Sequence, residues 1–241
     1  MFGQEGSRLR LEWGGEGVSA LGGSCAVLVV VDVLSFSTAV DVVVARGGSV
    51  RPIRWADRAG AAKPADPSWS LRPSSLVDVP AGVELELPSP NGATLCDAAA
   101  ATGAIVLAGC LRNAGSVAGA AADLAAGGPI GVIPAGERWG VDITTSRETA
   151  TFGPLRPAVE DLLGAGAILS ALRQQGLGPT STEASIAADT HDRTPIAHAL
   201  TTCVSGRELI AAGHAADVHL ASQVNASTAV PRLTNGTLRP T

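Results

Sequence analysis

The sequence predicts a three-layer α/β/α fold built on a mostly parallel or mixed sheet. Apolar segments typical of strands alternate along the chain with Ala-rich segments of helical spacing, which is the pattern of βαβ units. The second observation is the unbroken apolar run at residues 27–31. A strand with apolar side chains on both faces is covered by helices on both sides, as in a parallel sheet. We therefore expect residues 27–31 to form a central strand.

A carboxylate and a hydroxyl-rich turn follow this strand directly. Asp32 ends the run, Ser35, Ser37 and Thr38 come next, and a helix is expected at residues 39–46 with Ser37 or Thr38 as its N-cap. The carboxyl end of a strand is where open α/β sheets bind ligands, and a helix N-terminus suits a phosphate. Asp32 would then hold a cation or act on the phosphorus. The alternative is that these side chains only cap the turn and the helix.

The other elements are expected in the following order. An edge strand at 9–13 comes first. The strand at 27–31 and the helix at 39–46 are followed by a strand at 49–55 that Pro52 breaks. A helix at 56–65 and a proline-rich loop at 66–80 come next. Strands follow at 83–87, 104–108 and 130–134, with helices at 93–101 and 114–126 between them. A loop or lid at 138–155 precedes helices at 157–175, 182–200 and 205–213, a strand or helix at 216–220, and a hairpin turning at Asn235-Gly236. We expect one domain over residues 1–241, or two lobes.

Composition argues against several classes of protein. The 241 residues are 46% hydrophobic and only 3% aromatic, and the net charge is −5. Without a Lys/Arg cluster or stacking aromatics, nucleic acid is not an expected partner. No apolar run approaches the ~20 residues of a membrane helix and no signal-peptide core is visible, so we expect a cytoplasmic protein without membrane contact. The four cysteines lie far apart and are expected to be free thiols. Whether the protein forms a homo-oligomer stays an open question at this point.

Polar residues also fall at the carboxyl ends of other predicted strands. Asn91-Gly92, Asn113 and Glu137 each follow a strand, and on a parallel sheet these ends share one edge. Asn91 and Asn113 are candidates to donate to phosphate oxygens, and forming turns or capping helices is the alternative. Ser205-Gly206 precedes a short helix and is either an anion-binding nest or a cap.

Carboxylates that would suit magnesium are scarce. Mg²⁺ is held by carboxylate oxygens together with water and phosphate. Besides Asp32, the candidates are Glu160 and Asp161 in the first turn of the long predicted helix. Acidic residues in a first turn often only complement the helix dipole, and this is the alternative for the pair.

Several short segments, taken in their order and spacing, resemble the 2-phosphosulfolactate phosphatase family. They are Asp32-Val-Leu-Ser-Phe-Ser-Thr38, Asn91-Gly-Ala-Thr94, Gly109 with Asn113, Ala135-Gly-Glu137, residues 159–166, Ser205-Gly206 with Leu209, Gly213 and Asp217, and Val230-Pro231. The resemblance covers roughly residues 25–235. It implies a three-layer α/β fold and a phosphoric monoester hydrolase that uses Mg²⁺ to remove phosphate from a small sulfo- or hydroxy-acid on the route to coenzyme M.

The residue patterns and the resemblance together give the candidate residues the following expected roles. Asp32, Ser35 and Ser37 would be catalytic. Thr38, Asn91, Gly92, Asn113, Glu137, Ser205 and Gly206 would bind the phosphorylated acid. Asp32, Glu160 and Asp161 would hold Mg²⁺.

The chain departs from the family pattern in two places. Ser35 stands where the family has an Arg, and residues 71–76 replace a Gly-Phe-Asp segment whose Asp is a candidate metal ligand. Arg54 and Arg72 are the candidates to supply the missing guanidinium. Two other functions stay open. One is a non-catalytic relative that binds an anion. The other is an aspartyl-nucleophile phosphatase of the haloacid dehalogenase type, which is disfavoured because that class has a second Asp where this chain has Leu34.

Overall fold

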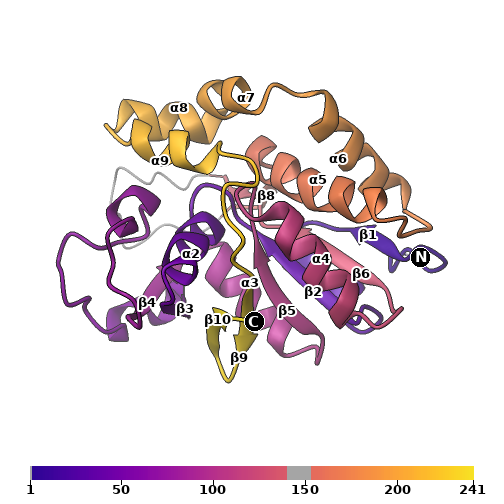
Figure 1. Ribbon diagram of the computed structural model, residues 1–241, viewed down its shortest axis with the longest axis horizontal. Coiled ribbons are helices and arrows are strands. Elements are labelled where there is room, and N and C mark those ends of the chain that lie inside the picture. The colour runs from indigo at the N-terminus through magenta and orange to yellow at the C-terminus, as the bar shows by residue number, and fades with distance from the viewer. Residues whose placement is uncertain (1, 140–152) are drawn as a thin grey trace.

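The computed structural model describes residues 2–139 and 153–241 and shows a mixed eight-stranded sheet between layers of helices (Figure 1). The strand order is β1 (Leu9–Leu11), β6 (Ile130–Pro134), β2 (Val27–Val31), β5 (Ile105–Gly109), β9 (Pro231–Thr234), β10 (Thr237–Pro240), β3 (Ser49–Arg54) and β4 (Glu84–Ser89). The helices are α1 (Gly14–Leu21), α2 (Phe36–Ala45), α3 (Gly92–Ala100), α4 (Ala114–Leu124), α5 (Val159–Gln174), α6 (Thr182–Arg193), α7 (Ile196–Thr202), α8 (Val204–Ala211) and α9 (Ala215–Ala221). Two 3₁₀ helices, η1 (Trp55–Gly60) and η2 (Pro73–Leu76), and a ribbon of β7 (Glu137–Arg138) and β8 (Leu155–Arg156) complete the described part.

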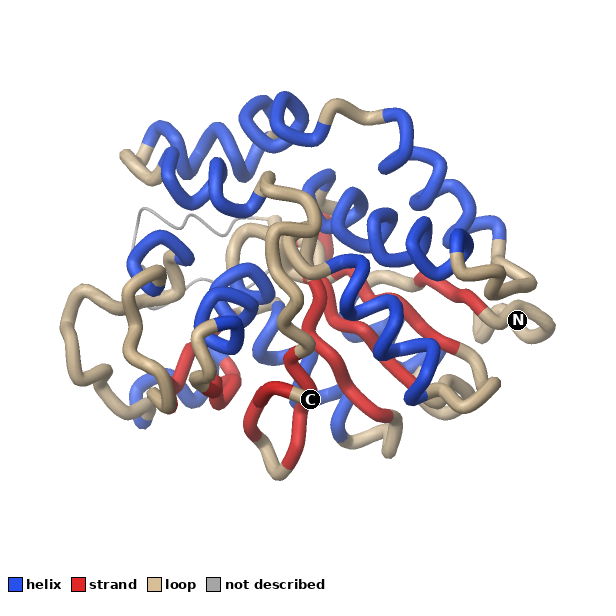
Figure 2. The backbone as a smooth tube through the Cα atoms, in the orientation of Figure 1, coloured by secondary structure: helices blue, strands red, loops and turns tan. Residues whose placement is uncertain are grey.

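The strand β2 lies inside the sheet, as its apolar run predicts. It pairs in parallel with β5 on one side and β6 on the other, and all five of its residues are fully buried. Its side chains alternate between two cores. Val27, Val29 and Val31 pack with residues of α4 and α5, whereas Leu28 and Val30 pack with residues of α1 and α3. Figure 2 shows α4 in front of the strands and α3 behind them. The predicted three-layer arrangement is therefore confirmed.

The C-terminal hairpin forms at the predicted turn but lies inside the sheet. Asn235 and Gly236 both have positive φ, of 50° and 76°, as a two-residue hairpin turn requires. β9 and β10 are antiparallel to their neighbours and lie between β5 and β3, so they join a four-stranded parallel group to the parallel pair β3 and β4. Strand order is set by packing between distant segments, and no local pattern predicts this insertion.

Four of the predicted elements differ from the structure. The helix after Asp32 begins at Phe36 with Ser35 at its N-cap, so the prediction of Ser37 or Thr38 as the cap is wrong. Residues 56–65 form only the short 3₁₀ helix η1 and a loop. The predicted helix 182–200 is two helices, because Pro195 lacks an N–H and restricts the residue before it. β3 continues through Pro52, which pairs with Leu87.

The remaining predictions of local structure are settled as follows. Residues 216–220 lie in α9. The predicted loop or lid at 138–155 falls mostly on residues 140–152, which lie outside the described residues, and its flanks form the β7–β8 ribbon. All four cysteines are free thiols, as predicted. In the described part of the chain, no helix combines the length and the apolar character that crossing a membrane requires.

Candidate active site

Asp32 is fixed at the carboxyl edge of the sheet by the first turns of two helices. One carboxylate oxygen, Oδ2, accepts a hydrogen bond of 2.8 Å from the Gly92 N–H at the start of α3. The other, Oδ1, accepts a longer bond of 3.3 Å from the Phe36 N–H at the start of α2. Unpaired N–H groups at a helix N-terminus stabilise a negative charge, so this carboxylate links α2 to α3. Asp32 is only 5% exposed.

Asp161 fixes the start of α5 to the same edge. Its Oδ1 accepts a 2.7 Å hydrogen bond from the N–H of Val33, the residue after Asp32. Its Oδ2 accepts a 2.9 Å bond from the Gly136 N–H, which follows β6. Glu160 and Asp161 are 4% and 3% exposed. The structure therefore places Asp161 beside the residue that follows Asp32, and Glu160 precedes Asp161 in the first turn of α5, but the three carboxylates do not form one group of metal ligands.

Crowding of carboxylates perturbs the site electrostatically. Burial raises the pKa of Asp32 to about 7, and Glu137 and Glu160 contribute, while the N–H groups of Gly92 and Phe36 oppose the rise. Burial, followed by the charges of Asp32 and Glu160, also raises the pKa of Asp161 well above its usual range. Desolvation and like charge both disfavour the ionised forms. This edge of the sheet would be stabilised by a bound cation.

The carboxylates fit magnesium by their chemistry, although they do not form a ready-made cage. Carboxylate oxygens are the ligands that Mg²⁺ prefers, and each has lone pairs beyond the one that a backbone N–H occupies. Among residues 2–139 and 153–241, no three His, Cys, Asp or Glu side chains are grouped as metal ligands. Mg²⁺ keeps several waters when bound and needs only one or two carboxylates.

Asn91 and Glu137 lie together at this edge, whereas Asn113 has a structural position. The Asn91 Nδ2 donates a 3.0 Å hydrogen bond to Glu137 Oε1, which also accepts from the Arg138 N–H at 3.0 Å. Asn113 is fully buried, and its Oδ1 accepts from the Cys110 N–H at 2.8 Å. Its Nδ2 has no hydrogen-bond partner among the residues that the structure describes. The side-chain oxygen of Asn113 therefore forms a turn, which is the alternative to phosphate binding that the sequence left open.

The hydroxyls after Asp32 are engaged with the backbone. Ser37 Oγ accepts from the Asp32 N–H at 3.0 Å and donates to the Val30 carbonyl at 3.3 Å. Thr38 Oγ1 donates to the Val33 carbonyl at 2.7 Å. Both residues are fully buried. Each hydroxyl has one proton, which is already donated, so this geometry supports a role in shaping the turn and does not support direct phosphate contact. Ser35 is half-buried, and its side chain makes no capping bond.

Two arginines on the β7–β8 ribbon were missed by sequence reasoning. Glu137 and Arg156 are directly opposite each other across the ribbon, and Arg138 pairs with Leu155. The Arg156 guanidinium lies 3.5 Å from the Ser205 Oγ, near the start of α8, and 5.9 Å from the centre of the Trp139 ring. Arg138 follows Ala135-Gly-Glu137 directly, and this was the available signal. The two arginines that were predicted to replace the family's Arg lie elsewhere and make other contacts.

Those predicted replacements, Arg54 and Arg72, are surface residues. Arg54 forms ion pairs with Asp57 at 2.7 Å and Asp97 at 3.7 Å. Arg72 lies 3.3 Å from the His214 Nδ1. Within the described part of the chain, the ion pairs and hydrogen bonds of both arginines are with residues other than the carboxylates at the sheet edge.

A buried ion pair that sequence analysis did not predict links α2 to the segment that follows β5. Arg112 Nε lies 2.8 Å from Asp41 Oδ2 on α2, and Asp41 is fully buried. Burial raises the pKa of Asp41, and hydrogen bonds from Ser227 and Arg112 oppose this. Arg112 also donates to Gln223 Oε1 at 2.7 Å, so α2 is joined to the segment after α9.

Comparison with known protein families finds a match over much of the chain. The profile of the 2-phosphosulpholactate phosphatase family matches residues 73–236, which is more than half of the chain. The matched span contains Asn91, Glu137, Glu160 and Asp161 and begins after Asp32. The structure joins the two parts through the contacts of Asp32 with Gly92 and of Val33 with Asp161. A comparison with curated proteins finds no match.

Proposed function

We propose that this chain, which belongs to the 2-phosphosulpholactate phosphatase family, is a magnesium-dependent phosphatase that hydrolyses a small phosphorylated sulfo- or hydroxy-acid. The observation that carries the proposal is the group of buried carboxylates at the carboxyl edge of the sheet, where burial and like charge raise the pKa of Asp32 to about 7. Such perturbed groups are typical of functional sites.

Asp32, Glu160 and Asp161 are the residues that would hold the metal. A bound Mg²⁺ supplies charge neutralisation and polarisation of a phosphoryl oxygen. Asp32 and Asp161 are oriented by backbone N–H groups from α2, α3 and the ends of β2 and β6, so their positions are preset by the fold. Glu160 is carried to the same edge by the first turn of α5.

Binding of the phosphate falls to groups around the carboxylates. Arg156 beside Ser205 and the first turn of α8 is the guanidinium that would take the role of the Arg missing at Ser35. Guanidinium groups bind phosphate in a bidentate manner that a hydroxyl cannot copy. In this proposal Ser37 and Thr38 act on the turn that carries Asp32, and they do not bind the phosphate.

A second candidate is an anion-binding relative without catalytic activity. It is favoured by two observations. Three metal-ligand side chains are not grouped in the described ranges, and Ser35 stands in place of an arginine. In this case the fold would bind a phosphorylated acid without cleaving it.

Phosphate release separates the two candidates. Wild-type protein is incubated with a panel of small phosphorylated acids, with magnesium or with a chelator, beside Asp32→Asn and the control Asp123→Asn, which changes an exposed residue of α4. We expect magnesium-dependent release that Asp32→Asn abolishes and Asp123→Asn keeps. Release that is unchanged in Asp32→Asn would reject the mechanism. No release from any acid, together with binding of one, would favour the non-catalytic relative.

A further inference from the structure

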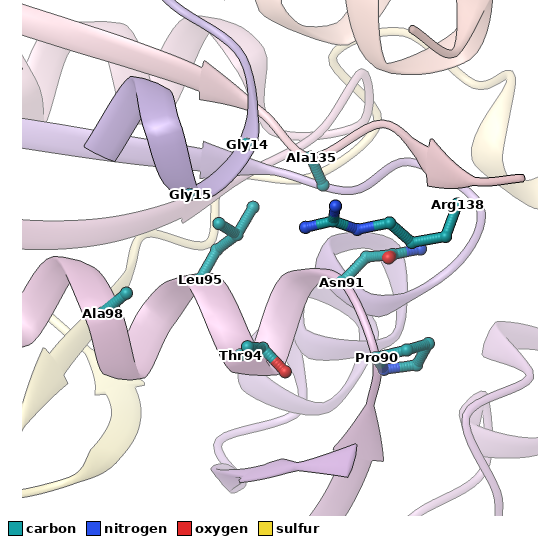
Figure 3. A pocket seen from close by; sticks show the side chains of 9 residues that line it. All are labelled: Gly14, Gly15, Pro90, Asn91, Thr94, Leu95, Ala98, Ala135 and Arg138. Carbon is teal, nitrogen blue, oxygen red and sulfur yellow. The ribbon is translucent and has the colours of Figure 1, made fainter. Parts of the chain in front are cut away.

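A small cavity lies beside Asn91 (Figure 3). It has a volume of about 80 Å³ and is bounded by Gly14 and Gly15 at the start of α1, by Asn91 and Thr94 near the start of α3, and by Arg138. The remaining wall is apolar, with Leu95, Ala98 and Ala135. One water needs only about 10–15 Å³ on this measure, so the cavity accommodates a small organic group.

Among the described residues that line the cavity, Arg138 is the one charged side chain. Figure 3 shows its guanidinium extending over Asn91 between Ala135 and Leu95. Successive side chains of a strand point to opposite faces, so Arg138 points away from the face of the ribbon that carries Glu137 and Arg156. Within the described ranges, no carboxylate forms an ion pair with Arg138.

The first turn of α1 brings backbone N–H groups to the wall of the cavity, and it also carries Glu16, whose carboxylate lies near Gly14. The N-cap residue Trp13 provides no side-chain acceptor for the first N–H groups of the helix. Gly14 has a φ of +61°, a conformation that favours glycine, and a Cβ at this position would meet the end of the Leu155 side chain on the ribbon. Helix N–H groups and a guanidinium on one wall are the donors that an oxyanion needs.

We infer that this cavity is the subsite for the second acidic group of the substrate, a carboxylate or a sulfonate, and that Arg138 is a specificity-determining residue. The inference rests on the proposed phosphatase function. Asn91 belongs to both places, since its side-chain amide binds Glu137 at the carboxylate edge and its other side faces the cavity. A short substrate therefore places its phosphate at the carboxylates and its acid beside Arg138, with its carbon chain against the apolar wall.

The inference is tested with three phosphate monoesters of similar size. They are the esters of glycolic acid, of 2-hydroxyethanesulfonic acid and of ethylene glycol, and the last has no second charge. The measured quantity is the ratio of kcat/KM for each acidic ester to that for the neutral ester. We expect Arg138→Gln to lower this ratio about tenfold to a hundredfold, because a charge-assisted bond is lost. Arg138→Lys should lower it less, since the charge remains without the fork.

Arg193→Gln is the matched control, because Arg193 is an exposed residue in the last turn of α6. Its ratio should equal that of the wild type. The acid whose ratio falls further identifies the subsite as one for carboxylate or for sulfonate. A ratio that Arg138→Gln leaves unchanged would overturn the subsite while the phosphatase function stands.

A direct binding measurement keeps the two proposals separable. Acetate and methanesulfonate are titrated into the protein, and the amide chemical shifts of Gly14 and Gly15 are followed. We expect saturable shifts that Arg138→Gln removes and Arg193→Gln keeps. If the wild type hydrolyses none of the esters, the proposed function fails. The chemical shifts then show by themselves whether the cavity binds an anion. No saturable shift with either anion overturns the subsite.

Discussion

Replacing Asp32 by asparagine is expected to stabilise the fold at pH 8 and to have little effect at pH 5. The pKa of Asp32 rises from 3.8 to about 7 in the folded protein, first through burial and then through Glu137 and Glu160. A group whose pKa is higher in the folded than in the unfolded state binds its proton more tightly when folded. The free energy of unfolding therefore falls as pH rises from about 4 to about 7. Asparagine carries no charge at any of these pH values, so Asp32→Asn removes this fall in the free energy of unfolding.

The magnitude follows from the same shift. A rise from 3.8 to about 7 corresponds to about 4 kcal/mol when the group is fully ionised. Asparagine keeps an acceptor for the Gly92 N–H but has none left for the longer bond from Phe36, which costs about 1–3 kcal/mol. At pH 5 the relief shrinks to roughly 1–2 kcal/mol, which this cost offsets. The stabilisation should therefore be larger at pH 8 than at pH 5 by roughly 2–3 kcal/mol.

Urea unfolding at a series of pH values measures this difference directly. Wild type, Asp32→Asn and Asp123→Asn are unfolded between pH 5 and pH 8 in the presence of a chelator, so that no bound metal contributes. The control changes an exposed carboxylate and should follow the wild type at every pH. An effect of Asp32→Asn that is the same at pH 5 and pH 8, or that is more destabilising at pH 8, would refute the electrostatic reasoning.

Three further substitutions test other parts of the site. Ser37→Ala leaves the buried Asp32 N–H without its acceptor, so the free energy of unfolding measured in urea should fall by about 1–3 kcal/mol; an effect on KM without loss of stability would instead indicate phosphate contact. Arg112→Met leaves the Asp41 carboxylate buried without its ion-pair partner and should cost about 3–5 kcal/mol in the same assay, and a double variant that also removes the carboxylate should recover much of it. Ser35→Arg adds a guanidinium at the N-cap of α2, and because Arg156 is proposed to bind the phosphate already, phosphate-release assays should show an unchanged kcat/KM; a clear rise would mean that no existing arginine fills this role.

Much of the fold and one anchor of the site follow from local sequence. The strand at residues 27–31 was predicted because five consecutive apolar residues require cover on both faces. The position of Asp32 at the end of that strand follows from the same run. The hairpin was predicted because Asn235 and Gly236 both tolerate positive φ. In each case the cause lies within about ten residues of the chain.

The remaining features depend on contacts between distant segments. The place of the hairpin between β5 and β3 is set by packing along the whole sheet. The fate of the Ser37 and Thr38 hydroxyls depends on where α2 begins, and a start at Phe36 turns both toward backbone carbonyls. Arg138 and Arg156 lie on two-residue strands, which are too short to produce a periodic pattern.

These differences divide the site into a fixed and an adjustable part. The oxygens of Asp32 and Asp161 accept backbone N–H groups from four segments, so a substitution at either carboxylate changes the packing of the sheet edge as well as its chemistry. Arg138 and Arg156 instead lie half-buried on the β7–β8 ribbon, outside the eight-stranded sheet. Substitution there changes which anion is held while the carboxylates keep their geometry. Preference among phosphorylated acids is therefore expected to respond to the ribbon, and the ability to bind a cation to Asp32 and Asp161.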